Sequence, residues 1–363
     1  MSSAGSVVLP ETRLLIGAER RDASDGKTVP TINPATAEAI TNVASATADD
    51  ARAAVAAARQ AFDTGVWAGL NGTDRGRILM KLADLIDANA DQMATLETMD
   101  NGKPFFESRK IDLPLAAEAF RYFAGWASKI HGETLPVRGP FHTYTRREPL
   151  GVVAGITPWN FPLVLSSYKV AAALAVGNSF VLKPAELTPL TCLRLGELAL
   201  EAGVPAGVLN VVTGRGSVVG EALVTDPRVA KISFTGSTAV GQGIMRSGAD
   251  TLKRLSLELG GKSANIVFAD ADLEAAVRGA INGVFYGKGE ICTAGSRLLV
   301  EASVHDKFVE MLKAKAEAMK QGDPFDPKTR IGAQASEAQM KSILGYIEKG
   351  KAEGARVITG GER

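Results

Sequence analysis

The sequence predicts an α/β protein built on a Rossmann-like, doubly wound parallel sheet. From Gly151 onward, short apolar segments of strand length alternate with helical segments, which is typical of a parallel sheet with helices on both faces. The chain has 363 residues, 45% of them hydrophobic, and this exceeds the usual size of one domain. We therefore expect a first α/β domain followed by a second one.

The N-terminal third is predicted to be mainly helical. Thr47 followed by Asp50 forms a capping-box pattern ahead of an alanine-rich helix. A second long helical pattern begins near Thr73 and ends at Asn101-Gly102, a pair suited to a left-handed cap. A third helix is predicted over residues 113–130.

Residues 129–149 interrupt the helical pattern. Alternation around His142–Arg147, with the pair Gly139-Pro140 before it, indicates a two-stranded ribbon. We expect this ribbon to act as an oligomerisation arm.

The predicted strands after the ribbon define the domain organisation. They cover residues 151–157, 179–183, 208–214, 229–236 and 252–259, and a segment at 263–269 that we expect to pair with 252–259. The predicted helices between them cover residues 166–177, 190–203, 217–224 and 237–248. The prediction is a cofactor domain from residues 1–128 and 150–260, the ribbon at 129–149, and a second domain at 261–363.

Composition excludes several classes of function. The 41 basic and 40 acidic residues are spread evenly, with a formal net charge of +1, so no basic face for nucleic acid is expected. Cys192 and Cys292 cannot form a disulfide framework and favour a reducing, cytoplasmic compartment. The N-terminus lacks the pattern of a secretory signal, and no apolar run is long enough to span a membrane. We expect a small, roughly neutral substrate.

Ligands bind beyond the carboxyl ends of parallel strands, so the residues that follow each strand are candidate site residues. Gly214–Gly220 and Thr235–Gly241 form glycine turns that lead into helices and can bind phosphate, although the first fits a structural turn equally well. Lys183 and Glu186 either bind ribose hydroxyls or form a surface ion pair. Asn160 lies in a loop flanked by prolines. It either stabilises a turn or donates a hydrogen bond from its side-chain amide to an oxyanion.

Two further residues are candidates for covalent and base chemistry. Cys292 lies in a polar, glycine-rich run at 288–297 and is the candidate nucleophile, whereas Cys192 occupies an apolar helical position typical of an inert buried thiol. Glu258 lies between two leucines of an apolar strand, so we expect it to be buried and thereby suited to base catalysis. The alternative is an ion pair with Lys262.

Five motifs occur in the order in which the aldehyde dehydrogenase superfamily has them, and the sequence resembles that family. The likeness extends from Asn33-Pro34-Ala35-Thr36 to the end of the chain. The motifs are Thr157-Pro-Trp-Asn-Phe-Pro162, Lys183-Pro-Ala-Glu186, Phe234-Thr-Gly-Ser-Thr-Ala-Val-Gly241, Leu257-Glu-Leu-Gly-Gly-Lys262 and Gly289-Glu-Ile-Cys-Thr-Ala-Gly-Ser-Arg297.

The resemblance implies a two-stage oxidation of an aldehyde to a carboxylic acid. Cys292 attacks the aldehyde carbon, and Asn160 with the Cys292 backbone amide holds the oxyanion. Hydride leaves to the nicotinamide, and Glu258 activates the water that hydrolyses the thioester. Relatives that transfer the acyl group to coenzyme A typically lack this glutamate, so the hydrolytic branch is implied.

The resemblance also implies an NAD site and no metal site. Lys183 and Glu186 match residues that bind the adenine-side ribose, and a carboxylate at 186 favours NAD, although NADP remains possible. The cofactor-binding residues implied are Ile156, Thr157, Trp159, Lys183, Glu186, Gly216, Gly220, Phe234, Gly236, Ser237, Leu259 and Gly260.

The sequence departs from the family pattern in two ways. Family members continue well past Arg363, so we expect a truncated catalytic domain, and a homodimer or homotetramer when full length. Glu290 replaces a frequent glutamine, and its charge is expected to disfavour the Cys292 thiolate slightly. Two alternatives to the dehydrogenase stay open: a catalytically incompetent NAD-binding protein, and a cofactor-independent thiol esterase.

Overall fold

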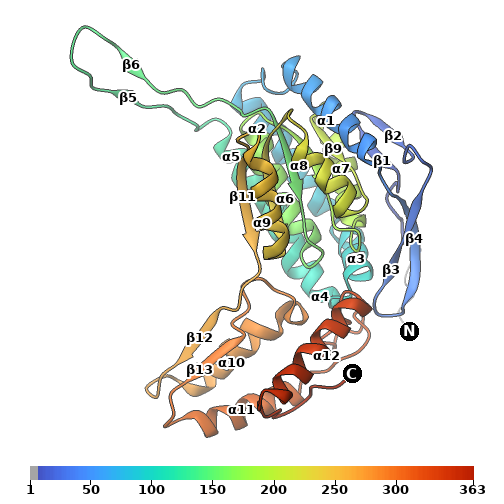
Figure 1. The fold of residues 1–363 in the computed structure, drawn as a ribbon, viewed down its shortest axis with the longest axis vertical. Coiled ribbons are helices and arrows are strands. Elements are labelled where there is room, and N and C mark those ends of the chain that lie inside the picture. The colour runs from blue at the N-terminus through green and yellow to red at the C-terminus, as the bar shows by residue number, and fades with distance from the viewer. Residues whose placement is uncertain (1–6) are drawn as a thin grey trace.

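The computed structural model describes residues 7–363 (Figure 1). The predicted domain start at residue 1 and the first part of the N-terminal segment examined for a signal lie outside the described residues. The strands are β1 (Leu14–Ile16), β2 (Glu19–Arg21), β3 (Thr28–Asn33), β4 (Glu38–Ala44), β5 (Thr134–Leu135), β6 (Thr143–Tyr144), β7 (Val152–Ile156), β8 (Ser179–Lys183), β9 (Leu209–Val211), β10 (Val229–Gly236), β11 (Arg254–Leu259), β12 (Ala264–Val267) and β13 (Arg297–Val300).

Helices connect most of these strands. They are α1 (Ala48–Asp63), α2 (Gly72–Ala88), α3 (Ala90–Asn101), α4 (Phe105–Glu107), η1 (Ser108–Asp112), α5 (Leu113–Trp126), α6 (Pro162–Ala175), α7 (Leu190–Ala202), η2 (Gly216–Gly220), α8 (Glu221–Thr225), α9 (Thr238–Ala249), α10 (Leu273–Phe285), η3 (Tyr286–Gly289), α11 (His305–Glu317) and α12 (Glu337–Ala352).

The predicted parallel sheet is confirmed, with an addition at one edge. The main sheet has the order β11-β10-β7-β8-β9-β1-β2, and its first five strands are parallel. The short strands β1 and β2 extend the other edge in antiparallel fashion and were not predicted. The chain moves outward from β7 to β9 and then returns to the other side of β7 with β10. A topological switch point, where such sheets bind ligands, therefore lies between β7 and β10.

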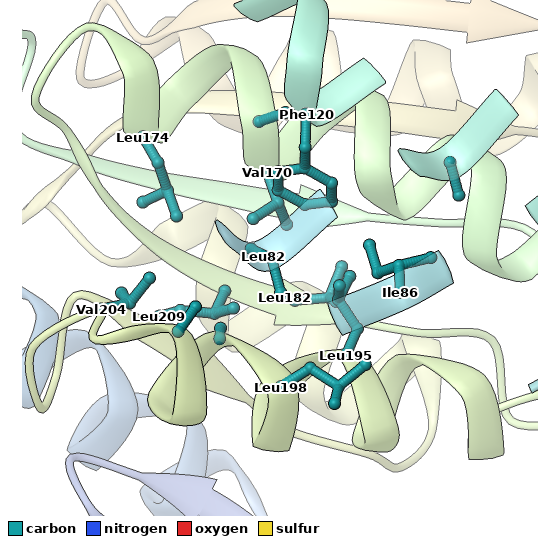
Figure 2. Close-up of a cluster of buried hydrophobic side chains, with 14 of the residues drawn as sticks. Leu82, Ile86, Phe120, Val170, Leu174, Leu182, Leu195, Leu198, Val204 and Leu209 are labelled. Atoms are coloured by element: carbon teal, nitrogen blue, oxygen red, sulfur yellow. The ribbon is translucent and has the colours of Figure 1, made fainter. Parts of the chain in front are cut away.

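Helices cover both faces of this sheet, as predicted. Neighbouring residues of β8 point to opposite faces, so Leu182 packs in the core under α2, α5, α6 and α7, while Val181 packs under α1 and α8. Figure 2 shows the first of these cores, in which Leu82 of α2, Phe120 of α5 and Val170 of α6 lie over Leu182. Strands that are buried on both faces are continuous apolar runs in the sequence. The alternation of strands with helices could therefore be recognised from the sequence.

The N-terminal helices differ from prediction at one point. The capping box of α1 is present, with Thr47 and Asp50 bonded reciprocally, and Gly102 caps α3 in the left-handed conformation. The single long helix predicted from Thr73 is instead two helices, because Asn89 leaves the helical conformation between them. Its side chain donates to the Leu85 carbonyl, and a side-chain bond of this kind competes with helix continuation.

The ribbon is confirmed as a pair of short antiparallel strands. Residue Thr134 pairs with Tyr144 and Leu135 pairs with Thr143. Figure 1 shows β5 and β6 extending away from the body of the molecule. The preceding helix α5 ends at Trp126, four residues before the predicted end at 130.

The predicted pairing of segments 252–259 and 263–269 is wrong. Strand β11 pairs with β10 in the main sheet, whereas β12 pairs in parallel with β13 in a separate sheet. The glycines at 260 and 261 leave the strand conformation and take the chain from one sheet to the other. Figure 1 shows β12, β13, α10, α11 and α12 as a unit beyond the end of β11. This unit has its own small core around Phe308.

Candidate active site

The residues predicted to bind the cofactor lie along one edge of the main sheet. Ile156 at the end of β7 pairs with Lys183 of β8 on one side and with Phe234 of β10 on the other. On the far side of β10, Gly236 pairs with Leu259 of the neighbouring strand β11. The carboxyl ends of these strands therefore meet at the topological switch point, where the fold is expected to bind a ligand.

Both predicted glycine turns border this edge. Ser237 caps the N-terminus of α9, and its side chain accepts a 3.4 Å hydrogen bond from the Val240 backbone N–H. A Cβ atom at Gly241 would lie only 2.6 Å from the end of the Leu259 side chain, so a larger residue would force that side chain to move. Gly220, at the end of η2, faces Ile156. N–H groups in the first turn of a helix such as α9 lack intrahelical partners and can bind phosphate.

Lys183 is buried, which excludes the surface ion pair considered for it. Its side chain is 3% exposed, and its Nζ donates to the Pro184 carbonyl at 2.8 Å. Burial lowers the pKa of Lys183 to about 8, and the nearby Glu186 carboxylate partly opposes this shift. Glu186 itself is exposed, so a carboxylate is available beside a buried ammonium at the end of β8.

The turn that precedes α6 brings Asn160 to the segment of the nucleophile. The Asn160 side-chain amide donates a 2.6 Å hydrogen bond to the backbone carbonyl of Glu290, two residues before Cys292. The adjacent Phe161 ring packs against Tyr286, with centroids 5.9 Å apart. These contacts join residues about 130 positions apart in the chain.

Cys292 lies in an exposed turn, as its polar surroundings predicted. The three residues Gly287, Lys288 and Gly289 all have positive φ, and Lys288 adopts it at +63° in spite of its side chain. A non-glycine residue in this conformation costs on the order of 1 kcal/mol, which the surrounding contacts must offset. The turn therefore presents Cys292 on a strained but well-anchored segment.

Cys192, by contrast, is fully buried in α7. Its Sγ lies 3.1 Å from the Ser166 hydroxyl, and burial raises its pKa to about 12. The thiol is therefore protonated at neutral pH, as an inert structural cysteine would be.

The prediction that Glu258 is buried is wrong. Leu257 and Leu259 pack toward α9, and strict alternation directs Glu258 to the opposite face of β11. Because β11 is the edge strand, this face is open and Glu258 is exposed. In the described part of the chain it forms no ion pair with Lys262, which excludes that alternative as well.

Lys169 of α6 is a charged neighbour of Glu258 that the sequence did not reveal. Burial lowers the pKa of Lys169 to about 8, and the Glu258 carboxylate opposes this shift. Its Nζ donates to the Ser233 hydroxyl of β10 at 3.1 Å. Lys169 occupies an ordinary helical position in the sequence, so only the packing of α6 on the sheet identifies it.

Glu290, whose charge was expected to disfavour the Cys292 thiolate slightly, has two partners for its carboxylate. Its carboxylate pairs with Lys288 at 2.9 Å and accepts a 3.0 Å hydrogen bond from the Ala335 backbone N–H. Both side chains of the pair are almost fully buried. The charge of Glu290 is therefore balanced by Lys288, within the segment that leads to Cys292.

A second buried ionic group lies behind the Asn160 turn. Lys103 is 1% exposed, pairs with Asp112 at 2.6 Å and donates to the Asn160 backbone carbonyl at 2.9 Å. Burial disfavours its charge, but the carboxylates of Asp112 and Glu97 outweigh this effect and raise the pKa of Lys103. Glu97 is fully buried as well; burial raises its pKa, and the Lys103 ammonium 3.7 Å away opposes this shift.

Glu107 adds a pH-dependent cost to this buried group. Burial raises its pKa from 4.5 to about 7, and its Oε2 has no hydrogen-bond partner in the described structure. The folded state thus binds the proton more tightly than the unfolded state, so stability is lost as pH rises from about 4.5 to about 7. We expect Glu107→Gln to increase the free energy of unfolding at pH 8 by roughly 2 to 3 kcal/mol.

Denaturant unfolding at a series of pH values measures this effect. The gain in the free energy of unfolding should shrink steadily as the pH falls toward 4.5, the ordinary pKa of the glutamate carboxyl. Glu118→Gln, an exposed glutamate on α5, is the matched control and should change stability little at any pH. A Glu107→Gln variant that is no more stable than the wild type at pH 8 would contradict the assignment.

A large groove lies away from the nucleophile. It has a volume of about 900 Å³ and lies between the β3–β4 hairpin, the loop at Glu186 and Leu187, and α12. Cys292, Asn160 and Glu258 do not line it. Volume alone therefore does not locate the chemistry of this chain, whereas the side-chain contacts do.

Residues 7–363 contain neither a candidate metal site nor a candidate membrane-spanning helix. Within this range, histidine, cysteine and acidic side chains form no group of three or more that could hold a metal ion. The same residues include no helix long and apolar enough to cross a membrane.

Comparison with known proteins identifies the family. The sequence model of the aldehyde dehydrogenase family matches residues 21–363. Human mitochondrial aldehyde dehydrogenase is 47% identical over 96% of this chain and 68% of its own length, and human retinal dehydrogenase 2 is 47% identical over 97% and 68%. The structure of a Bacillus cereus aldehyde dehydrogenase in complex with NAD+ superposes with a TM-score of 0.95, at 46% identity, over 97% of this chain and 72% of that one. This chain therefore belongs to the aldehyde dehydrogenase family.

Proposed function

We propose that this chain oxidises a small aldehyde to the carboxylic acid, with NAD as the hydride acceptor. The observation that carries the proposal is the contact between Asn160 and the Glu290 carbonyl, which places an amide donor beside the turn of an exposed cysteine. The solved NAD+ complex of the similar Bacillus cereus enzyme supports the choice of cofactor. The exposed carboxylate of Glu186 favours NAD over NADP, whose 2′-phosphate it would repel.

In the first stage, the Cys292 thiolate bonds to the aldehyde carbon, and the carbonyl oxygen becomes an oxyanion. The Asn160 amide and the Cys292 backbone N–H donate hydrogen bonds to that oxygen. Bound NAD supplies an acceptor for the hydride, which leaves the same carbon as the carbonyl bond re-forms. An acyl thioester on Cys292 remains.

In the second stage, Glu258 removes a proton from water, and the resulting hydroxide attacks the thioester carbon. The bond to sulfur breaks, which releases the carboxylic acid and restores the thiolate. Because Glu258 is exposed on an edge strand, water reaches it freely. A Cβ atom at Gly261 would lie 3.6 Å from the Cys292 backbone carbonyl, so the Cys292 turn lies close to the chain three residues after Glu258.

We propose roles for the three regions of the chain on the same grounds. Residues 1–128 and 150–260 bind the cofactor along the carboxyl edge of the main sheet, and residues 261–363 supply the nucleophile. The cofactor contacts are those of the strand ends and glycine turns, with Trp159 and Gly260 among them. The ribbon at 129–149 mediates association into homodimers or homotetramers, which its exposed side chains Phe141 and Tyr144 support.

Aldehyde-dependent reduction of NAD tests this function. The 363-residue chain is mixed with NAD and a panel of aliphatic and aromatic aldehydes, and reduced nicotinamide and acid are both measured. We expect the two products in equal amounts. NAD binding without reduction would instead indicate a non-catalytic cofactor binder. Hydrolysis of an activated ester, with no NAD reduction, would indicate a cofactor-independent thiol esterase.

A further inference from the structure

The Asn160 turn and the turn that carries Cys292 are both hydrogen-bonded to one short segment at the end of α3. The Asn101 side chain donates to the Trp159 carbonyl at 2.7 Å, and Lys103 donates to the Asn160 carbonyl at 2.9 Å. On the other side, Lys288 donates to the Asn101 backbone carbonyl at 2.7 Å. The Asn160 turn and the turn of the nucleophile are thereby held from the same three residues, 101–103.

This segment has little freedom to move. Gly102 is left-handed, at φ +82°, and a Cβ there would lie 2.8 Å from the Ala333 carbonyl. A Cβ at Gly332 would lie 1.9 Å from the Gly102 carbonyl, so two backbones pack directly against each other. The ammonium of Lys103 also lies 4.4 Å from the centroid of the Phe161 ring, next to Asn160.

We propose that Lys103 is a positioning residue for the oxyanion site, an inference that rests on the proposed function. It acts through Asn160: the charged hydrogen bond to the Asn160 carbonyl fixes the turn, and the turn fixes where the side-chain amide points. The pair with Asp112 holds the ammonium in place. A charge-assisted hydrogen bond in a buried setting is strong and directional, so its loss should let the amide move away from the developing oxyanion.

The test measures acylation of Cys292, which needs the oxyanion site and needs no NAD. The probe is p-nitrophenyl acetate, and the burst of nitrophenolate reports the acylation rate. We expect Lys103→Met to slow the burst on the order of 10-fold to 100-fold, because misplacing a catalytic group by about 1 Å has effects of this size. Thr191→Val is the matched control, since it removes a buried 2.7 Å hydrogen bond to Glu97 in the same cluster without touching Lys103.

A double-mutant cycle separates positioning from general stability. In an Asn160→Ala background no side-chain amide remains to be positioned, so Lys103→Met should then slow the burst less than about 3-fold. If Lys103→Met slowed the burst in the Asn160→Ala background as much as it does in the wild type, the proposal would be overturned. An unchanged burst rate in Lys103→Met alone would overturn it as well. Failure of the proposed function gives different results: a chain that only binds the cofactor gives no burst in the wild type, and a thiol esterase gives the burst but no aldehyde-dependent NAD reduction.

Folding of the variants is checked by circular dichroism. Lys103→Met leaves the Asp112 carboxylate buried without its partner, which can destabilise the protein strongly. Lys103→Met/Asp112→Asn removes both charges and should fold, with the same slow burst. If both variants fail to fold, Lys103 serves the stability of the fold and the positioning role is overturned.

Discussion

Replacing Cys292 with alanine should abolish aldehyde-dependent NAD reduction. Without the sulfur, no covalent adduct forms with the aldehyde carbon, and hydride cannot leave that carbon. We therefore expect turnover to fall on the order of 10⁴-fold or more. The side chain is exposed and does not pack in a core, so the variant should keep the stability and NAD affinity of the wild type. Steady-state NAD reduction and calorimetric titration with NAD measure the two properties.

The second cysteine of the chain provides the control. Cys192→Ala removes a fully buried thiol from α7, so it should lower stability modestly and leave turnover close to that of the wild type. Cys292→Ala with turnover intact, or Cys192→Ala with turnover lost while the variant remains folded, would refute the assignment of the nucleophile.

Replacing Glu258 with glutamine should separate the two chemical stages. The amide cannot take a proton from water, so thioester hydrolysis should slow by roughly 10²-fold to 10⁴-fold, the usual contribution of a general base. Acylation and hydride transfer do not use this group. We therefore expect a rapid burst of reduced nicotinamide, at most one equivalent per Cys292, followed by almost no steady turnover.

Rapid-mixing absorbance and mass spectrometry of the trapped acyl-enzyme follow these stages. Arg254→Gln is the control, because it changes a charged, exposed residue at the other end of the same strand and should preserve multiple turnovers. A Glu258→Gln variant whose steady rate equals that of the wild type would exclude Glu258 as the base. Loss of the burst as well as the steady rate would assign it to the first stage.

The sequence determined the fold class and the sites along one edge of the sheet. Strands buried on both faces are continuous apolar runs, and their alternation with helices specifies a parallel, doubly wound sheet. Once the strands are located, their carboxyl ends locate Ile156, Lys183, Phe234 and Leu259 together. Local rules were also sufficient for the cap at Thr47.

The sequence could not determine which partner each side chain meets across the fold. The two leucine neighbours of Glu258 predict that it is buried. It is exposed because β11 is an edge strand, and the order of the strands is a property of the whole sheet. Likewise β11 and β12 are consecutive and still belong to different sheets. Nearest-neighbour patterns do not encode these long-range choices.

The supporting residues of the site were decided by tertiary structure alone. Lys103 follows a helix cap in the sequence and resembles a surface lysine, yet it is fully buried because Asp112 and the Asn160 carbonyl are there to satisfy its charge. Burying a lysine is favourable only when such partners converge on it. The Asn160 carbonyl that helps to satisfy it is 57 positions away, so its convergence on Lys103 arises from the packing of the elements that carry them.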